Sequence, residues 1–145
     1  MRYLIYVSQA KHPMSREELA DILAGARRWN EAHGITGLLI YRHAPERNRG
    51  HFMQLIEGEA EALGATYERI VADPRHHTKI VLEEGDTGER AFPNWTMGFR
   101  DLDPGELADD PNFRDLGSET FEARARAGDI RGALSLMRSF YDAVD

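Results

Sequence analysis

Residues 51–57 are His-Phe-Met-Gln-Leu-Ile-Glu, a short and mostly apolar run with one amide, Gln54, at its centre. A run of this length and composition is typical of a strand buried in a sheet. The stretch 35–42, Ile-Thr-Gly-Leu-Leu-Ile-Tyr-Arg, has the same character. We therefore expect two strands here, joined by a polar segment 43–50 that is long for a hairpin loop.

Two helical segments flank this pair of strands. The first begins with Ser15-Arg16-Glu17-Glu18, which fits a capping box, continues to about Ala32 and is ended by Gly34. The second covers residues 59–72 and ends at Asp73-Pro74, because proline cannot continue the helical hydrogen bonds. Both segments carry apolar side chains at helical spacing, which predicts that each covers a sheet with one face.

Three more strands are predicted, over residues 2–8, 79–84 and about 95–100. The order of elements is then βαββαββ. This order indicates an α+β sandwich in which two helices cover one face of a mixed sheet.

The composition changes in the last third of the chain. Residues 101–117 are acidic and interrupted by two prolines, and a final helix is predicted from about Asp129. Its apolar stripe consists of Ile130, Ala133, Leu134, Met137, Phe140, Tyr141 and Val144. We expect a domain over residues 1–100 and a C-terminal helical extension, residues 101–145, that packs on the sheet or at a subunit interface.

Charge and composition exclude several classes of protein. The 145 residues include 18 Lys and Arg against 25 Asp and Glu, so the net charge is −7, which disfavours binding to a nucleic-acid backbone. Cysteine is absent, which excludes disulfides, thiolate metal sites and thiol nucleophiles. No apolar run approaches the length of a membrane span. We expect a cytoplasmic protein that binds neither nucleic acid nor membrane.

The sequence contains no common catalytic motif and no strong metal motif. A P-loop, G-x-S-x-G and H-E-x-x-H are all absent. His43 and His51 flank the 43–50 segment, but Glu46 is the only carboxylate near them before Glu57. A solvated hairpin explains these histidines better than a metal site, and we expect no metal.

Three polar residues are more informative, because they lie in apolar surroundings. Tyr6 lies between Ile5 and Val7, Gln54 lies inside the third strand, and Asn30 lies near the end of the first helix. A buried hydroxyl or amide costs free energy unless it is hydrogen-bonded. Each one alone fits a satisfied core residue or a helix cap. Gln54 fits that explanation least well, because both ends of its amide need partners.

Together, several segments over about residues 2–100 resemble the BLUF family of flavin-based blue-light sensors, and they occur in that family's order. The segments are Arg2-Tyr3-Leu4-Ile5-Tyr6-Val7-Ser8, Ala26-Arg27-Arg28-Trp29-Asn30 followed by Gly34-Ile35-Thr36-Gly37-Leu38-Leu39, Phe52-Met53-Gln54-Leu55-Ile56-Glu57-Gly58, Asp73-Pro74-Arg75-His76, and Glu89-Arg90-Ala91-Phe92-Pro93-Asn94-Trp95-Thr96-Met97-Gly98-Phe99. Each motif alone is weak, and the set of five in register is specific.

The resemblance implies a ferredoxin-like fold, with a five-stranded sheet and a flavin inserted between the two helices. The implied cofactor is FAD, with FMN or riboflavin as alternatives. The implied cofactor-binding residues are Tyr6, Ile22, Asn30, Phe52, Gln54, Ile70, Asp73, Arg75 and His76. For Arg75, a surface salt bridge competes with a contact to a phosphate or to the flavin pyrimidine.

The resemblance also implies a mechanism. Tyr6 would donate an electron and a proton after excitation, and Gln54 would rearrange or tautomerise. The flavin would gain a hydrogen bond and its absorption would shift slightly to the red. Either Trp95 or Met97 would lie near Gln54 and relay the signal, whereas the plain alternative is that both are core residues.

Two features depart from the family pattern. The segment 43–50 is longer than we expect, and Trp29 stands where the family often has a polar residue facing the flavin. Trp29 therefore puts one flavin contact in doubt, and bears on affinity or on which flavin binds.

We expect a sensor rather than an enzyme, with output in trans through a separate protein and a homodimer or higher oligomer. Two alternatives stay open. One is a BLUF-like interaction module without photoactivity. The other is a small flavoenzyme or hydrolase on a related fold, for which Gln9-Ala10-Lys11-His12 is a weak anion-binding candidate.

Overall fold

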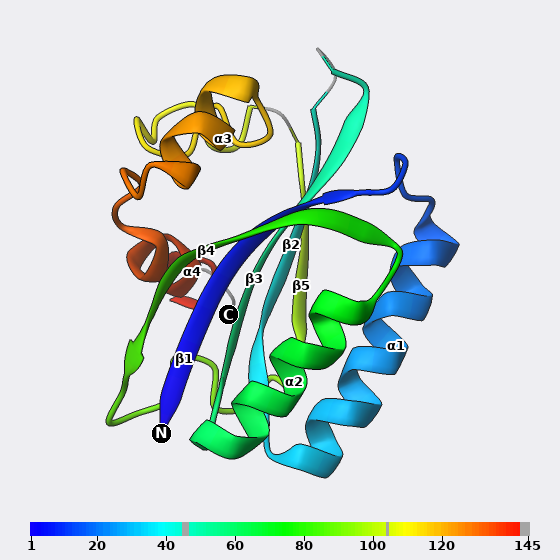
Figure 1. Ribbon diagram of the computed structural model, residues 1–145, viewed down its shortest axis with the longest axis vertical. Coiled ribbons are helices and arrows are strands. Elements are labelled where there is room, and N and C mark those ends of the chain that lie inside the picture. The colour runs from blue at the N-terminus through cyan, green and yellow to red at the C-terminus, as the bar shows by residue number, and fades with distance from the viewer. Residues whose placement is uncertain (45–46, 104, 143–145) are drawn as a thin grey trace.

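The computed structural model describes residues 1–44, 47–103 and 105–142, and it contains a five-stranded sheet with helices on both faces (Figure 1). The elements are β1 (Arg2–Ala10), α1 (Arg16–His33), β2 (Thr36–Ala44), β3 (Arg49–Gly58), α2 (Ala60–Ala72), β4 (His76–Asp86), β5 (Gly98–Leu102), α3 (Glu119–Arg126) and α4 (Ala133–Asp142). The predicted βαββαββ order and the α+β class are confirmed.

The sheet has the strand order β4-β1-β3-β2-β5. The pairs β1–β3, β1–β4 and β2–β3 are antiparallel, whereas β2 and β5 run parallel, so the sheet is mixed as predicted. In the centre of the sheet, Gln54 pairs with Tyr6 on one side and with Leu39 on the other. Directly paired residues point to the same face, so these three side chains lie in one row.

Helix α1 begins and ends as the sequence predicts. Ser15 Oγ accepts a hydrogen bond from the Glu18 amide (3.1 Å), and Glu18 Oε1 accepts one from the Ser15 amide (3.0 Å). Gly34 closes the helix in the left-handed conformation, with φ of 68°.

Several predicted boundaries are wrong, two of them next to the site strands. The two strands extend into both ends of the polar segment 43–50, because His43 pairs with Gly50 and Ala44 with Arg49, whereas residues 47–48 form a turn. Hydrogen bonding between the strands continues through these polar residues, and burial of Ala44 and Gly50 supports it. The last strand begins at Gly98 rather than at about residue 95, because the segment before it forms turns and bends.

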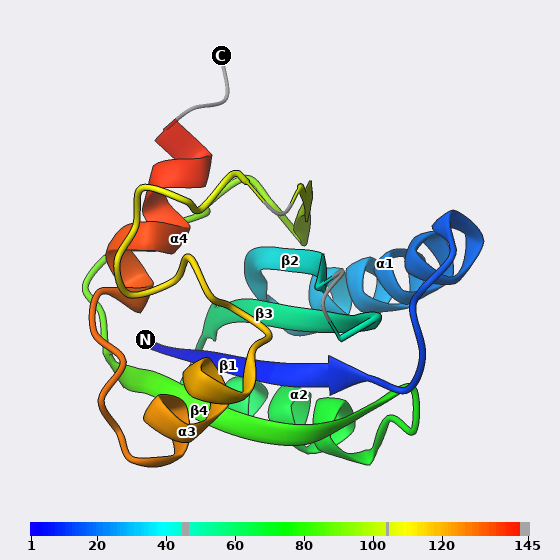
Figure 2. The same ribbon diagram turned by 90° about the horizontal axis from the view of Figure 1, so that it is seen from above.

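The two faces of the sheet carry separate apolar clusters. Helices α1 and α2 cover one face, and residues 105–142, including α3 and α4, cover the other (Figure 2). Alternation along the strands sorts the side chains, so Tyr6 and Phe52 face α1 and α2 whereas Val7 and Met53 face the C-terminal residues.

Helix α4 begins at Ala133, later than the predicted start near Asp129. Ile130, Ala133 and Met137 are buried against the sheet, and Leu134 and Phe140 are partly buried there. The side chains of Tyr141 and Val144, which the sequence also assigned to this stripe, lie outside the described part. Among the described residues, no helix has the length and apolar character needed to cross a membrane.

Candidate functional site

Tyr6 and Gln54 form a buried hydrogen-bonded pair across β1 and β3. The Tyr6 hydroxyl donates to Gln54 Oε1 over 2.5 Å, and the two residues are 3% and 5% exposed. Burial is the main cause that raises the pKa of Tyr6 above its ordinary value, so the phenol is neutral and acts as the donor. Because Gln54 Oε1 accepts this hydrogen bond, the NH₂ group of the Gln54 amide can donate to another partner.

The second partner of Gln54 is Met97. Gln54 Nε2 donates to Met97 Sδ over 3.5 Å, and Met97 is 2% exposed. Trp95 instead packs among the residues of the opposite cluster, where its ring stacks on Phe92 at 5.5 Å. Of the two candidates for the residue near Gln54, Trp95 and Met97, it is therefore Met97 that lies beside Gln54.

A cavity opens between α1 and α2 beside this pair, with an empty volume of about 490 Å³ that includes its open mouth. It is lined by Tyr6, Ile22, Ala26, Leu39, Phe52, Gln54, Arg69, Ile70, Asp73, Arg75 and His76. All the predicted cofactor-binding residues except Asn30 are in this lining. The lining combines apolar walls with a polar inner edge, the composition of a site for a flat aromatic ring with polar substituents.

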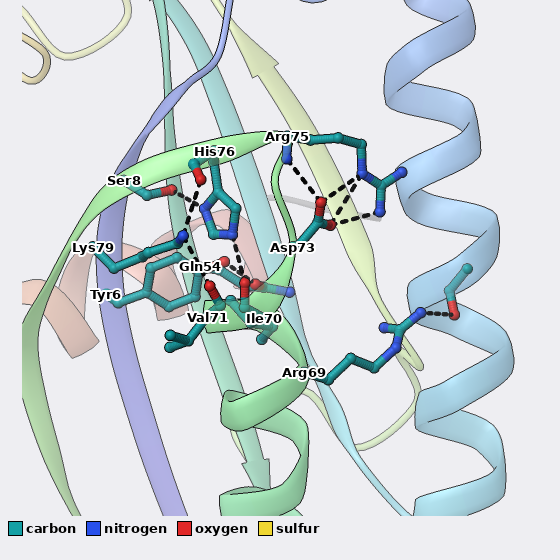
Figure 3. A network of polar contacts seen from close by, with 11 residues as sticks. Tyr6, Ser8, Gln54, Arg69, Ile70, Val71, Asp73, Arg75, His76 and Lys79 are labelled. Atoms are coloured by element: carbon teal, nitrogen blue, oxygen red, sulfur yellow. Dashed lines mark hydrogen bonds and ion pairs between the residues drawn. The ribbon is translucent and has the colours of Figure 1, made fainter.

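Three lining residues were not predicted. Ala26 lies one helical turn after Ile22, and Leu39 pairs with Gln54 in the sheet, so spacing and register would have indicated both. Arg69 had no sequence signal. Its guanidinium reaches across the groove, where Nη2 lies 3.5 Å from the Gly25 carbonyl oxygen (Figure 3).

Asn30 is buried beside this cavity rather than in its lining. Its Nδ2 donates to the Thr96 carbonyl over 2.5 Å, and the neighbouring Met97 carbonyl accepts a 3.0 Å hydrogen bond from Arg27 Nε. Two residues of α1 therefore hold the backbone that carries Met97.

The polar end of the cavity contains an ion pair (Figure 3). Arg75 Nε lies 2.9 and 3.0 Å from the two carboxylate oxygens of Asp73, and Arg75 Nη2 lies 2.6 Å from Oδ2. Burial alone would raise the pKa of Asp73, but its hydrogen bonds with Arg75 outweigh burial and hold that pKa below its ordinary value. The salt bridge, one of the alternatives for Arg75, is present.

His76 is clamped between a strand and a helix. Its Nε2 donates to the Ile70 carbonyl (2.8 Å), and its Nδ1 lies 2.7 Å from Ser8 Oγ (Figure 3). Burial lowers the pKa of His76, partly offset by the Ile70 hydrogen bond, so the ring is neutral and Nδ1 accepts from Ser8. His76 thereby ties the end of α2 to β1, next to Tyr6.

Comparison with known proteins identifies the family of this chain. A family model described as sensors of blue light using FAD (BLUF) matches residues 1–98. The chain belongs to the BLUF family. A photoactivated adenylate cyclase subunit beta of Euglena longa is 39% identical over 95 residues, which cover 65% of this chain and 10% of that protein. The blue light- and temperature-regulated antirepressor BluF of Escherichia coli is 32% identical over 99 residues, covering 68% of this chain and 23% of the relative.

Solved BLUF structures share the fold. The ground state of BlsA superposes with a TM-score of 0.72 at 26% identity, covering 99% of this chain and 89% of BlsA. The dark state of BlrB gives a TM-score of 0.66 at 29% identity, covering 92% of this chain and 96% of BlrB. The chain thus spans about a tenth to a quarter of the curated relatives named above, but nearly the whole of these solved chains.

BLUF domains bind a flavin, and the cavity in this chain fits one. The apolar side chains of Ile22, Phe52 and Ile70 line its walls, which suits both faces of a planar ring. The amide of Gln54 lies at the inner edge of the cavity, where it could form hydrogen bonds with the polar edge of the flavin ring.

Trp29, the departure from the BLUF pattern, is not part of the lining of this cavity. Its Nε1 donates to Thr66 Oγ1 over 2.9 Å, its ring stacks on His33 at 3.8 Å, and the Arg69 guanidinium lies 5.2 Å from the ring centre. Trp29 therefore joins α1 to α2 instead of lining the cavity.

Proposed function

We propose that this chain senses blue light through the hydrogen bonds that join Tyr6, Gln54 and Met97, with the bound flavin as the light absorber. The observation that carries the proposal is the short Tyr6–Gln54 hydrogen bond at the inner edge of the cavity. A flavin held there supplies a strong oxidant after it absorbs blue light.

Tyr6 is the electron and proton donor in this scheme. A phenol is oxidised more readily when its proton has an acceptor in place, and Gln54 Oε1 lies 2.5 Å from the hydroxyl. The proton of Tyr6 can therefore move to Gln54 Oε1 without reorganisation of the protein, while the electron would go to the excited flavin. The return of both the electron and the proton to Tyr6 would restore the starting composition, so the process is a switch and not a turnover.

Gln54 holds the two states of the switch. An amide offers one donor and one acceptor group, so rotation or tautomerisation exchanges what it presents to Tyr6 and to the cavity. Either change alters the contact between Nε2 and Met97 Sδ. Two hydrogen-bonding arrangements of similar free energy form the bistable element that a sensor needs.

The output that we propose is a change in protein–protein contact. Met97 directly precedes β5, and the segment before it carries Phe92 and Trp95 into the cluster beneath α3 and α4. A shift of Met97 thus reaches the covered face of the sheet. The name of the Escherichia coli relative, an antirepressor, gives a precedent for action on a separate protein. We therefore propose a partner in trans and no enzymatic activity of residues 1–145.

Flavin reconstitution followed by light-minus-dark absorption spectroscopy tests the proposal. The expected result is a reversible red shift under blue light, which Gln54→Leu abolishes while far-UV circular dichroism stays native. A protein that binds no flavin, or one whose flavin spectrum ignores blue light, would contradict it. A pull-down in light and darkness then tests the partner in trans.

A further inference from the structure

Strand β3 ends in a buried carboxylate that the light reaction does not use. Glu57 is 1% exposed and lies three residues after Gln54, so it points to the opposite face of the sheet. Burying a carboxylate costs free energy unless hydrogen bonds within the protein replace those that it made with water. The partners of Glu57 therefore indicate what its charge holds in place.

Two of those partners belong to the segment 89–97, which leads to Met97, and the third lies in β2. Glu57 Oε1 accepts from the Ala91 amide, and Oε2 accepts from the Phe92 amide, each over 2.8 Å. The Thr36 hydroxyl also donates to Oε2 over 2.8 Å. Both carboxylate oxygens are thus occupied, and two consecutive backbone amides are fixed to the end of β3.

Arg90 reinforces the same junction from the other side. Its Nη1 donates to Thr36 Oγ1 and its Nη2 to the Gly34 carbonyl, each over 2.8 Å. The guanidinium therefore orients the Thr36 hydroxyl, which donates a hydrogen bond to Glu57, and it connects the start of the segment to the end of α1.

The far end of the segment is held as well. The Gly37 amide donates to the Trp95 carbonyl (3.0 Å), and Asn30 donates to the Thr96 carbonyl. Gln54 and Glu57 lie on the same strand, and Gln54 Nε2 donates a hydrogen bond to Met97 Sδ. Strand β3 and the segment from Phe92 to Met97 are therefore joined at both ends, by the Phe92–Glu57 hydrogen bond and by the Gln54–Met97 hydrogen bond.

We propose that Glu57 is a positioning residue of the light switch, which sets how Met97 Sδ meets Gln54 Nε2. This role rests on the proposed function. A carboxylate suits it because all three neighbours of its oxygens are donors. A glutamine at this position would turn one NH₂ group toward an N–H or O–H donor and release one of them.

The test compares the rate of dark recovery after blue light in flavin-loaded variants of the full chain. Glu57→Gln should keep the red shift but slow dark recovery by about threefold or more, in the same direction as Met97→Leu. In the Met97→Leu background, Glu57→Gln should add little, because its effect passes through Met97. Glu89→Gln, an exposed carboxyl in the same segment, is the matched control and should recover as the wild type does.

Three outcomes would overturn the role. The first is wild-type recovery in Glu57→Gln, and the second is an undiminished effect of Glu57→Gln in the Met97→Leu background. If Glu57→Gln does not fold, Thr36→Val takes its place, because it removes one donor from Oε2 and one acceptor from Arg90. The third contradicting outcome is then unchanged recovery in Thr36→Val. A wild-type protein without a red shift would instead overturn the proposed function, and this role with it.

Discussion

The Tyr6 hydroxyl and Gln54 Oε1 lie 2.5 Å apart because β1 and β3 place these two residues directly opposite each other on the face covered by α1 and α2. The backbone register, and not a flexible loop, sets this distance. Residues held by a paired strand need little reorganisation before proton transfer, which favours a fast and reproducible switch.

Tyr6→Phe should retain the fold and the flavin but lose the red shift, because the donor of the electron and proton is removed. Difference absorption spectroscopy under blue light checks this result. Tyr67→Phe is the matched control, since the Tyr67 ring lies 6.0 Å from the Tyr6 ring, edge to face, on the same side of the sheet. A normal red shift in Tyr6→Phe would refute its role as donor.

Met97→Leu should slow dark recovery by about threefold while changing stability little, because leucine conserves volume but offers Gln54 no acceptor. The reason is that the return to the dark state regains part of the contact between Nε2 and Sδ. Time-resolved absorption after a light pulse measures the rate. Met53→Leu, fully buried on the opposite face, serves as the control and should leave the rate unchanged.

Trp95→Ala should instead lower the free energy of unfolding by about 2 kcal/mol, because the Trp95 ring packs on Phe92 and over Gly98. Chemical denaturation gives the free energy of unfolding. A Trp95 variant that alters dark recovery more than Met97→Leu does would reverse the assignment of the two residues.

Gly117→Ala should lower the free energy of local unfolding of the C-terminal extension by about 1–3 kcal/mol. Gly117 has φ of 96°, and a Cβ there would lie 2.6 Å from the His51 ring. Its carbonyl also accepts a hydrogen bond from Arg47 over 2.7 Å. Limited proteolysis of the extension measures the effect. Gly88→Ala, whose Cβ would enter open space, should be neutral, and equal cleavage of both variants would contradict the prediction.

His51 should make stability depend on pH. Burial, followed by the charges of Arg47, Arg42 and Arg49 and opposed by Glu122, lowers the pKa of His51 to about 4. The unfolded chain then binds a proton that the folded chain does not, so stability falls as the pH drops from about 6.5 toward 4, by at most about 1.4 kcal/mol per unit.

Urea denaturation at pH 7.5 and pH 5 checks this dependence in the wild type and in His51→Gln. The loss of stability between the two pH values should be smaller in His51→Gln, because glutamine does not titrate. His77→Gln, at an exposed imidazole on β4, is the control and should show the wild-type loss. An identical loss in His51→Gln and the wild type would show that other groups cause the acid sensitivity.

Much of this protein follows from its sequence. Alternation of apolar residues, the capping box at Ser15 and the break at Asp73-Pro74 predicted the strands, the helices and their order, because these are local signals. Five motifs in register indicated the family and most of the cavity lining. The placement of Asn30 beside the cavity rather than in its lining could not be predicted, since it depends on where the Thr96 carbonyl lies.

Other features were decided only by the tertiary structure. Trp95 and Met97 are both apolar and lie in an irregular segment, so no periodicity distinguishes them, and contacts with Phe92 and Gln54 separate them in space. The strand pairing at residues 43–44 and 49–50 escaped prediction because a polar strand end resembles a loop until its partner strand is known. The role that we propose for Glu57 has the same origin, since its partners are 21 to 35 residues away along the chain. Sequence determines which local elements form, whereas long-range hydrogen bonds and packing decide which side chains meet.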